Sequence, residues 1–307
     1  MKKHIFLFLA LILLATAAFP ETASEYINIA ERYYNEGNFC KAIQVLQEGE
    51  RLYPDDAILH VALGNTYHHL KDYGLALRHL SKAIELNNTL AEAYSIRAGV
   101  YESTTDYVKA LDDLNMTIQL EPANDRYHWY RANLLYTKIG DFTQALNDFN
   151  KAIELNPLNY KNFQQRGVFY ENQGLYEEAL VDFDEAVKLN NKDVENFTNR
   201  GVVFFRLGRD TDAMNDFATA IHLDGNDIRG YFERGDVNLF FGRYNEAVLD
   251  FTEVIRIDPN NSEAYHGRSI AYDRLAGITN DPVLKRQYIR MADEDEAAAA
   301  RLGWNKR

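Results

Sequence analysis

Apolar and small residues recur along the chain with a period of 34 residues, lengthened to 35 in one interval. Alanine marks the period at Ala42, Ala76, Ala110, Ala145, Ala179, Ala213 and Ala247. A large apolar residue follows each alanine by four positions: Leu46, Leu80, Leu114, Phe149, Phe183, Phe217 and Phe251. Residues four apart lie on one face of an α-helix, so each period is predicted to contain an amphipathic helix.

Each period also carries the marks of a turn before this helix and of a stop after it. Five turns contain a glycine five residues before the alanine: Gly37, Gly140, Gly174, Gly208 and Gly242. Glycine adopts the left-handed conformation that ends a preceding helix. Four periods close with proline, which a helix interior excludes: Pro54, Pro122, Pro157 and Pro259. The repeating unit is therefore predicted to be two helices joined by a tight turn.

Some units depart from this pattern. Lys71 and Thr105 stand where the turn glycine is expected, and Asp210 stands where an aromatic residue usually precedes the alanine. We expect these three turns to be the least regular. Arg131 stands 14 residues before its alanine, whereas the equivalent arginines stand 13 before theirs at Arg97, Arg166, Arg200 and Arg234. The extra residue leaves the helical phase of the fourth unit open.

The first 18 residues have the pattern of a secretory signal. Lys2 and Lys3 precede an apolar run over residues 5–14, and small residues follow at positions 15 to 18. The run is shorter than the ~20 residues of a spanning helix, which favours cleavage near Ala17 or Ala18 over retention as an anchor. We expect an exported chain with no membrane insertion after cleavage. A bacterial periplasm is favoured, and a secreted or surface-exposed chain is the alternative.

The last unit begins like the others but has an insertion after Gly277. Asp281 and Pro282 then suit the N-cap and the first position of a new helix. The segment 282–303 has a largely polar exterior, so it is predicted to be a helix that caps the open end of a repeat array.

Two segments, NFTNRG at 196–201 and GYFERG at 230–235, resemble a motif of the tetratricopeptide repeat (TPR) family. The resemblance implies an all-α fold, a right-handed solenoid of about eight helix-turn-helix repeats over residues 23–303. The repeats are expected to begin near residues 23, 57, 91, 126, 160, 194, 228 and 262. The resemblance also implies that the first helices line a concave groove, where a protein or peptide partner binds.

The positions that the resemblance turns toward the groove vary between units. In the second unit they hold Asn65, His68 and His69. In the fourth to seventh units they hold Tyr127, Tyr130, Leu134, Gln164, Val168, Glu171, Thr198, Val202, Phe205, Arg206, Arg229, Phe232, Asp236 and Phe240. This mixture suits a peptide whose apolar side chains enter pockets while polar rims fix its register. The alternative is that Phe205, Phe232 and Phe240 pack between neighbouring first helices.

The net charge and the placement of polar residues limit the classes of partner and of activity that the chain can have. The formal net charge is −13 and becomes two charges more negative when the signal is removed. Such a surface, without a basic patch, disfavours nucleic acid and anionic membranes as partners. Acids and arginines recur in nearly every unit, so we interpret them as ion pairs of the hairpin rather than catalysts. They are Asp113, Asp148, Asp182, Asp216 and Asp250, with Arg97, Arg166, Arg200, Arg234 and Arg268.

Motifs of catalysis or metal binding are not found in the sequence. It contains no phosphate-binding loop, nucleophile elbow or zinc-protease motif. His60, His68 and His69 share one predicted helix but do not converge on a point, so no metal and no cofactor are expected. We therefore favour an exported, non-enzymatic scaffold or adaptor over an adhesin-like surface or secreted ligand-binding protein. An enzyme or a metal carrier is the least favoured alternative.

Overall fold

The computed structural model describes residues 22–304, and the predicted signal segment lies outside this range. The described chain consists of α-helices and one π-helical turn and has no strand. The all-α prediction is confirmed. The described helices group into two compact units, residues 22–155 and 156–304.

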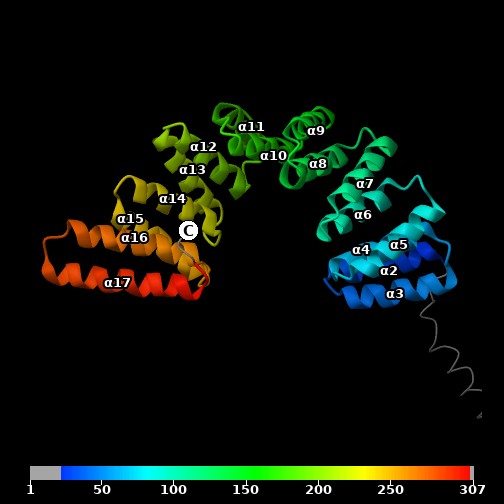
Figure 1. Ribbon diagram of the computed structural model, residues 1–307, viewed down its shortest axis with the longest axis horizontal. Coiled ribbons are helices and arrows are strands. Elements are labelled where there is room, and N and C mark those ends of the chain that lie inside the picture. The colour runs from blue at the N-terminus through cyan, green and yellow to red at the C-terminus, as the bar shows by residue number, and fades with distance from the viewer. Residues whose placement is uncertain (1–21, 305–307) are drawn as a thin grey trace, which may run out of the picture. The chain divides into compact units, whose positions relative to one another are not determined.

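The first unit is a stack of antiparallel helical hairpins (Figure 1). The first helices α2, α4 and α6 pack side by side, and each also packs against the second helix of its own hairpin. The helices are α2 (Ala23–Asn35), α3 (Phe39–Leu52), α4 (Ala57–His69), α5 (Tyr73–Leu86), α6 (Ala91–Ser103), α7 (Tyr107–Leu120), α8 (Asp125–Leu134) and α9 (Phe142–Leu155), with the π-helical turn η1 (Leu135–Ile139) between the last two.

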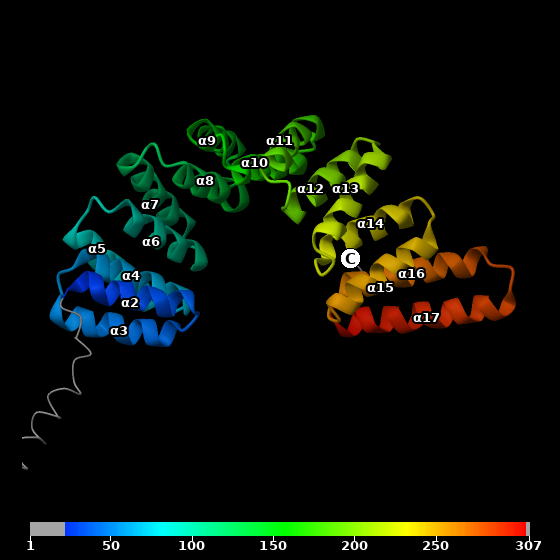
Figure 2. The ribbon, with the colours of Figure 1, turned by 180° about the vertical axis from the view of Figure 1, so that it is seen from behind.

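The second unit repeats this arrangement (Figure 2). Its first helices α10, α12, α14 and α16 each contact the next along the unit. The helices are α10 (Tyr160–Asn172), α11 (Tyr176–Leu189), α12 (Val194–Arg206), α13 (Asp210–Leu223), α14 (Ile228–Phe240), α15 (Tyr244–Ile257), α16 (Ser262–Ile278) and α17 (Pro282–Arg301). At the start of α17 the Asp281 carboxylate accepts hydrogen bonds from the backbone N–H groups of Val283 and Leu284.

Small residues bring the two helices of a hairpin close together. Ala179 is fully buried, and so is Phe183 four residues later. The glycine of the NFTNRG segment, Gly201, lies so near the ring of Phe217 that an added Cβ would be 2.6 Å from it. The recurring glycine therefore makes room for the large residue of the second helix.

The turns at Lys71 and Thr105 are as regular as those with glycine, so the expectation of irregularity was wrong. Their φ angles of 61° and 63° lie in the left-handed region, near the 74° of Gly174. Lys71 N–H donates to His68 C=O at 2.9 Å, as Gly174 N–H donates to Glu171 C=O at 2.9 Å. The last carbonyls of the helix need these donors, which fixes the conformation whatever the residue.

The third turn expected to be irregular, before Asp210, also has the common geometry. Gly208 has a φ of 72°, and Arg209 N–H donates to Phe204 C=O at 2.8 Å. The irregular repeat is instead the fourth hairpin, formed by α8 and α9, where η1 accommodates the extra residue. There Gly140 N–H donates to Leu135 C=O, five residues back, at 2.7 Å.

The recurring arginines and aspartates pair within the third to eighth hairpins, which confirms their interpretation as ion pairs. Each arginine comes from a first helix and donates from Nε and Nη2 to one carboxylate on the second helix. The pairs are Arg97–Asp113, Arg131–Asp148, Arg166–Asp182, Arg200–Asp216, Arg234–Asp250 and Arg268–Asp295.

Candidate functional site

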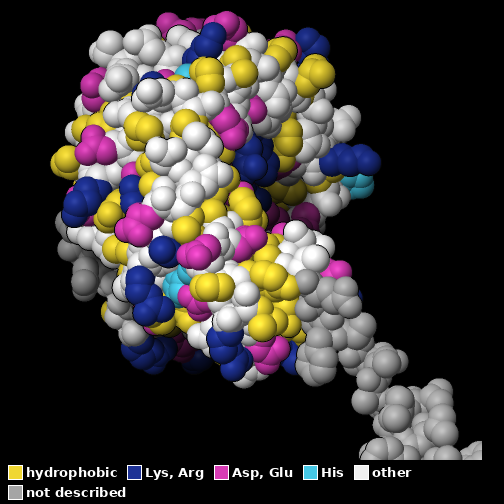
Figure 3. Space-filling view, turned by 90° about the vertical axis from the view of Figure 1, so that its right-hand side faces the viewer, with side chains coloured by type: hydrophobic (Ala, Val, Ile, Leu, Met, Phe, Trp, Pro, Cys, Tyr) yellow, Lys and Arg dark blue, Asp and Glu magenta, His cyan; other side chains and the backbone are white. Residues whose placement is uncertain are grey.

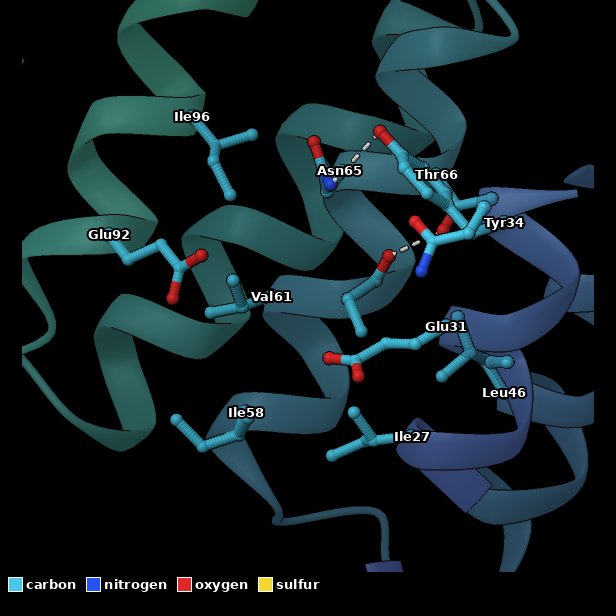
Figure 4. Close-up of a pocket in the computed structure, with 13 residues that line it drawn as sticks. Ile27, Glu31, Tyr34, Leu46, Ile58, Val61, Asn65, Thr66, Glu92 and Ile96 are labelled. Atoms are coloured by element: carbon cyan, nitrogen blue, oxygen red, sulfur yellow. Dashed lines mark hydrogen bonds between the residues drawn. The ribbon is translucent and has the colours of Figure 1, made fainter. Parts of the chain in front are cut away.

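A pocket of about 260 Å³ lies across α2, α4 and α6 in the first unit. Apolar side chains from all three helices line it, among them Ile27, Val61 and Ile96. Glu31 on α2 and Glu92 on α6 point their carboxylates into the space from opposite sides (Figure 4). Both glutamates are exposed, so their charges face the solvent-filled pocket.

Asn65 on α4 stands between this pocket and a second one. Its side-chain amide donates to the hydroxyl of Tyr34 at 3.4 Å. Asn65 and Ile96 line both pockets, so the two adjoin. The second pocket is more apolar, and Leu114, Trp129, Tyr130 and His68 are among the residues that line it.

Trp129 is a pocket residue that the sequence interpretation missed. Its ring packs edge-on against Tyr130, with centroids 5.2 Å apart. The predicted residue Tyr127, by contrast, is buried. The π-helical turn adds one residue to the fourth hairpin, so the positions of α8 are shifted by one relative to the pattern counted from Ala145. The extra residue between Arg131 and Ala145 was the sequence signal of this shift.

In the second unit, acidic side chains gather along the first helices. They are Glu171 on α10, Glu233 and Asp236 on α14 and Glu263 on α16, with Arg206 on α12 among them. Burial raises the pKa of Glu233 to about 7, and the charges of Asp236 and Glu171 act in the same direction while Arg206 opposes them.

Asp236 behaves similarly, although part of its side chain is exposed to water. The surrounding protein atoms raise its pKa to about 6, and Glu263 contributes to the rise. A side chain in a hollow can touch water and still lose much of its hydration, so the two findings are compatible.

An aromatic cluster lies where α12 and α14 end. Phe205 packs edge-on against Phe240 at a centroid distance of 5.2 Å, and Phe240 packs against Phe241 at 5.2 Å. Phe240 is 73% exposed. Phe232 differs, because its ring contacts the buried Phe251 at 5.8 Å and belongs to the core of its hairpin.

The other predicted groove residues differ in exposure. Arg206 and Arg229 are exposed, Val168, Glu171 and Val202 are half-buried, and Gln164 and Thr198 are buried. The Thr198 hydroxyl donates to Val194 C=O in its own helix at 3.2 Å. Arg229 is paired with Asp227 and Glu195. Contact of any of these residues with a partner stays a prediction.

The sequence interpretation also missed a cluster in the first unit, formed by Glu50 on α3, His60 on α4 and His79 on α5. The sequence interpretation considered only histidines that share one helix, whereas these three side chains come from three different helices. A signal was present in the repeat, because Glu50 stands where the second to seventh hairpins have isoleucine or valine: Ile84, Ile118, Ile153, Val187, Ile221 and Ile255.

The surface carries charges of both signs. On the face shown in Figure 3, Lys and Arg side chains are interspersed with Asp, Glu and hydrophobic side chains. Between residues 22 and 304, no helix combines the length and the apolar character needed to cross a membrane.

Comparison with known proteins gives a consistent family. The chain matches tetratricopeptide repeat families over residues 27–91, 129–157, 149–181 and 228–261. Hsc70-interacting protein 1 of Drosophila melanogaster is 28% identical over 117 residues, which are 38% of this chain and 31% of the relative. The chain thus spans about a third of the length of that relative.

Two solved structures show the same fold over most of the chain. A tetratricopeptide repeat protein from Parabacteroides merdae has a TM-score of 0.62 at 20% identity, covering 82% of this chain and 99% of the other. The C-terminal part of a TPR repeat-containing protein from Cytophaga hutchinsonii has a TM-score of 0.60 at 17% identity, covering 78% and 98%.

Proposed function

Because this chain belongs to the tetratricopeptide repeat family, we propose that it is an exported, non-enzymatic scaffold that holds a protein or peptide partner along its first helices. Proteins of this family generally act as binding scaffolds rather than catalysts. The name of the Drosophila relative describes a protein that interacts with another protein, and its similarity to part of this chain supports the same kind of role.

The observation that carries the proposal is the pair of glutamates across the apolar pocket of the first unit. Glu31 and Glu92 approach the pocket from two different helices. A lysine or arginine of a partner placed between them forms charge-assisted hydrogen bonds with both carboxylates. Apolar neighbours in the same segment then cover Ile27 and Ile96. The partner segment is therefore proposed to combine basic and apolar residues.

The second unit supports the same chemistry for the partner. Its acidic cluster contains four carboxyl groups and the single arginine Arg206. The repulsion among these carboxyl groups is relieved when a positive charge approaches them. Phe240 is exposed and lies on the same helix as Glu233 and Asp236. Its ring offers an aromatic surface for an apolar side chain of the partner.

Export is proposed from the pattern of the first 18 residues, and a bacterial periplasm is the favoured setting. The alternative is a surface or secreted chain that binds a ligand in the manner of an adhesin. Treating intact cells with a protease separates the two, because a surface-exposed chain is cut and a periplasmic chain is protected.

The binding proposal is tested with short synthetic peptides that combine apolar residues with lysine or arginine, beside peptides in which glutamate replaces the basic residues. We expect the basic peptides to bind and the acidic ones to fail. Glu31→Gln combined with Glu92→Gln should weaken binding by about tenfold or more.

The control variant combines Asp112→Asn with Glu177→Gln, which removes the same charge from exposed positions on second helices. Equal weakening by both double variants would show that overall charge attracts the peptides and would overturn the assignment of the groove. Equal binding of acidic and basic peptides would overturn the proposed partner chemistry.

A further inference from the structure

The second hairpin lacks the ion pair that the later hairpins share. Leu63 occupies the position of the arginine, and His79 occupies the position of the aspartate. His60 stands where most other units have a phenylalanine or tyrosine: Tyr94, Phe163, Phe197 and Tyr231. Together with Glu50, which replaces a branched apolar residue, two histidines and one acid depart from the repeat pattern.

These three departures meet at one point. His60 Nδ1 and His79 Nδ1 are 3.1 Å apart, and Glu50 Oε1 lies 3.8 Å from the first and 3.7 Å from the second. Both histidine side chains are at least nine-tenths buried, whereas Glu50 is 31% exposed. Other repeats fold with different residues at these three positions, so packing of the repeat does not require two histidines and a glutamate here. Their convergence therefore requires another explanation.

The environment orients His60 as a ligand. His60 Nε2 lies 2.9 Å from the carbonyl oxygen of Pro54, which can only accept a hydrogen bond. The proton of the neutral ring is therefore on Nε2, and the lone pair of Nδ1 points toward His79 and Glu50. A backbone carbonyl that fixes the far nitrogen of a histidine is a common outer contact in metal sites.

We propose that Glu50, His60 and His79 form a binding site for Zn²⁺ or a similar divalent transition-metal ion, with one coordination position left for a further ligand. Two imidazoles and a carboxylate are a frequent zinc ligand set, and three protein ligands leave the fourth tetrahedral position open. Metal–ligand bonds of ~2.0–2.1 Å place tetrahedral ligand atoms about 3.4 Å apart. The observed separations require only a small inward movement of the Glu50 carboxylate.

Metal binding requires one rearrangement at His79. The Arg78 guanidinium, a donor only, lies 3.1 Å from His79 Nε2, so in the metal-free chain the His79 proton is on Nδ1 and is donated to His60 Nδ1. On binding, this proton moves to Nε2 and Arg78 turns away, which its exposed position on α5 permits.

The fourth hairpin supplies an internal comparison. His128 also places Nε2 against a proline carbonyl, that of Pro122, at 3.1 Å. Its Nδ1 faces Asp148 at 3.2 Å, but Asp148 is held by both Nε and Nη2 of Arg131. A guanidinium at that carboxylate opposes a metal cation, so the proposal is limited to the site around His60 and His79, where Leu63 replaces the arginine.

The test is a titration of the full chain, freed of metal by a chelator, with Zn²⁺ and then with Co²⁺. We expect one Zn²⁺ per chain, a higher melting temperature in its presence, and the visible absorption of tetrahedral Co²⁺. Glu50→Ile and His60→Tyr restore residues found at these positions in other repeats, so both should fold. Each should weaken Zn²⁺ binding by about tenfold or more, because it removes a ligand.

Control variants carry Glu48→Gln, an exposed acid on the same helix as Glu50, or the pair His68→Asn and His69→Asn. Both controls should bind Zn²⁺ like the unchanged chain. Glu50→Gln, which keeps the shape of the side chain, is a second ligand variant should Glu50→Ile alter the melting temperature without metal. The proposal is overturned if the unchanged chain binds no Zn²⁺, or if binding survives the ligand changes and is lost in the His68 and His69 variant.

Discussion

Arg268 donates two hydrogen bonds to the carboxylate of Asp295, which lies 27 residues further along the chain, at 2.7 and 2.8 Å. Arg200 holds Asp216 in the same bidentate way across 16 residues. Because the geometry is the same, α17 corresponds to the second helix of the other hairpins. The helices α16 and α17 therefore form the eighth hairpin. Because Asp295 is buried and fully paired, α17 is attached by the same contact that closes the other hairpins.

The first prediction concerns this attachment. Asp295→Ala leaves the guanidinium of Arg268 partly buried without its carboxylate partner, and should lower the free energy of unfolding by about 3 kcal/mol. Urea denaturation measures the loss, and hydrogen exchange should locate it in α16 and α17. Asp293→Ala, at an exposed position on α17, should change stability by less than about 0.5 kcal/mol. Equal effects of the two changes would contradict the role given to the ion pair.

Much of the fold follows from the sequence because each unit repeats the same packing problem. The alanine at Ala179 and the large residue at Phe183 are both fully buried, as the spacing predicts. The partner of Arg268 did not follow, because α16 is longer than the other first helices and Asp295 lies further from the start of its helix than Asp216 does, so the separation grows from 16 to 27 residues. Pairing across an insertion depends on three-dimensional placement, which spacing does not contain.

The second prediction concerns the turn after α4. Lys71 holds a φ of 61°, which costs an L-amino acid about 1 kcal/mol or more. Lys71→Gly removes this strain and should raise the free energy of unfolding by about 1 kcal/mol, less the extra chain entropy of glycine. Thermal unfolding measures the gain. The reverse change at an equivalent turn, Gly174→Ala, should lower stability by a similar amount, and a loss in both variants would refute the strain.

The candidate site was less accessible to sequence reasoning than the fold. The family resemblance assigns inward positions, but it does not tell which of them a neighbouring helix covers. Gln164 and Thr198 are buried, whereas Phe240 is largely exposed, although the same pattern selected all three. Glu50, His60 and His79 lie on three helices, so their convergence required the packing of the hairpins.

The third prediction concerns pH. The folded pKa of Glu233, about 7, lies above its ordinary value, so the folded state holds more protons than the unfolded state between these two values. The stabilising contribution of Glu233 is therefore complete below about pH 4.5 and is lost as pH rises through 7. Glu233→Gln, which cannot ionise, should be more stable than the unchanged chain at pH 8 by about 2 kcal/mol.

The difference between the two chains should nearly vanish at about pH 4, below the ordinary pKa of a glutamate. Denaturation with urea at both pH values measures it. Glu177→Gln, an exposed change on α11, serves as the control and should show no such dependence on pH. A Glu233→Gln variant whose stability follows that of the unchanged chain at every pH would refute the buried, repelled state of this carboxyl group.

The last prediction separates the aromatic residues that build the hairpins from those that contact a partner. Phe232 packs on the buried Phe251, so Phe232→Ala should lower the free energy of unfolding by about 2 to 3 kcal/mol, less than for a fully buried ring. Phe240 is 73% exposed, so Phe240→Ala should change stability by less than about 0.5 kcal/mol. If Phe240 anchors the partner, its loss should weaken binding of the basic and apolar peptides by about 2 kcal/mol.

Thermal unfolding and peptide binding are therefore measured on the same preparations of Phe205→Ala, Phe232→Ala and Phe240→Ala. Phe205, half-buried against Phe240, should show a smaller change of each kind, because its ring both packs and supports the exposed one. Lost binding with preserved melting in Phe240→Ala assigns the exposed ring to recognition. The opposite result is unchanged binding in Phe240→Ala together with a lower melting temperature in Phe232→Ala. That result would show that the aromatic residues of the second unit serve packing only, and would assign the contacts with the partner to the acidic side chains.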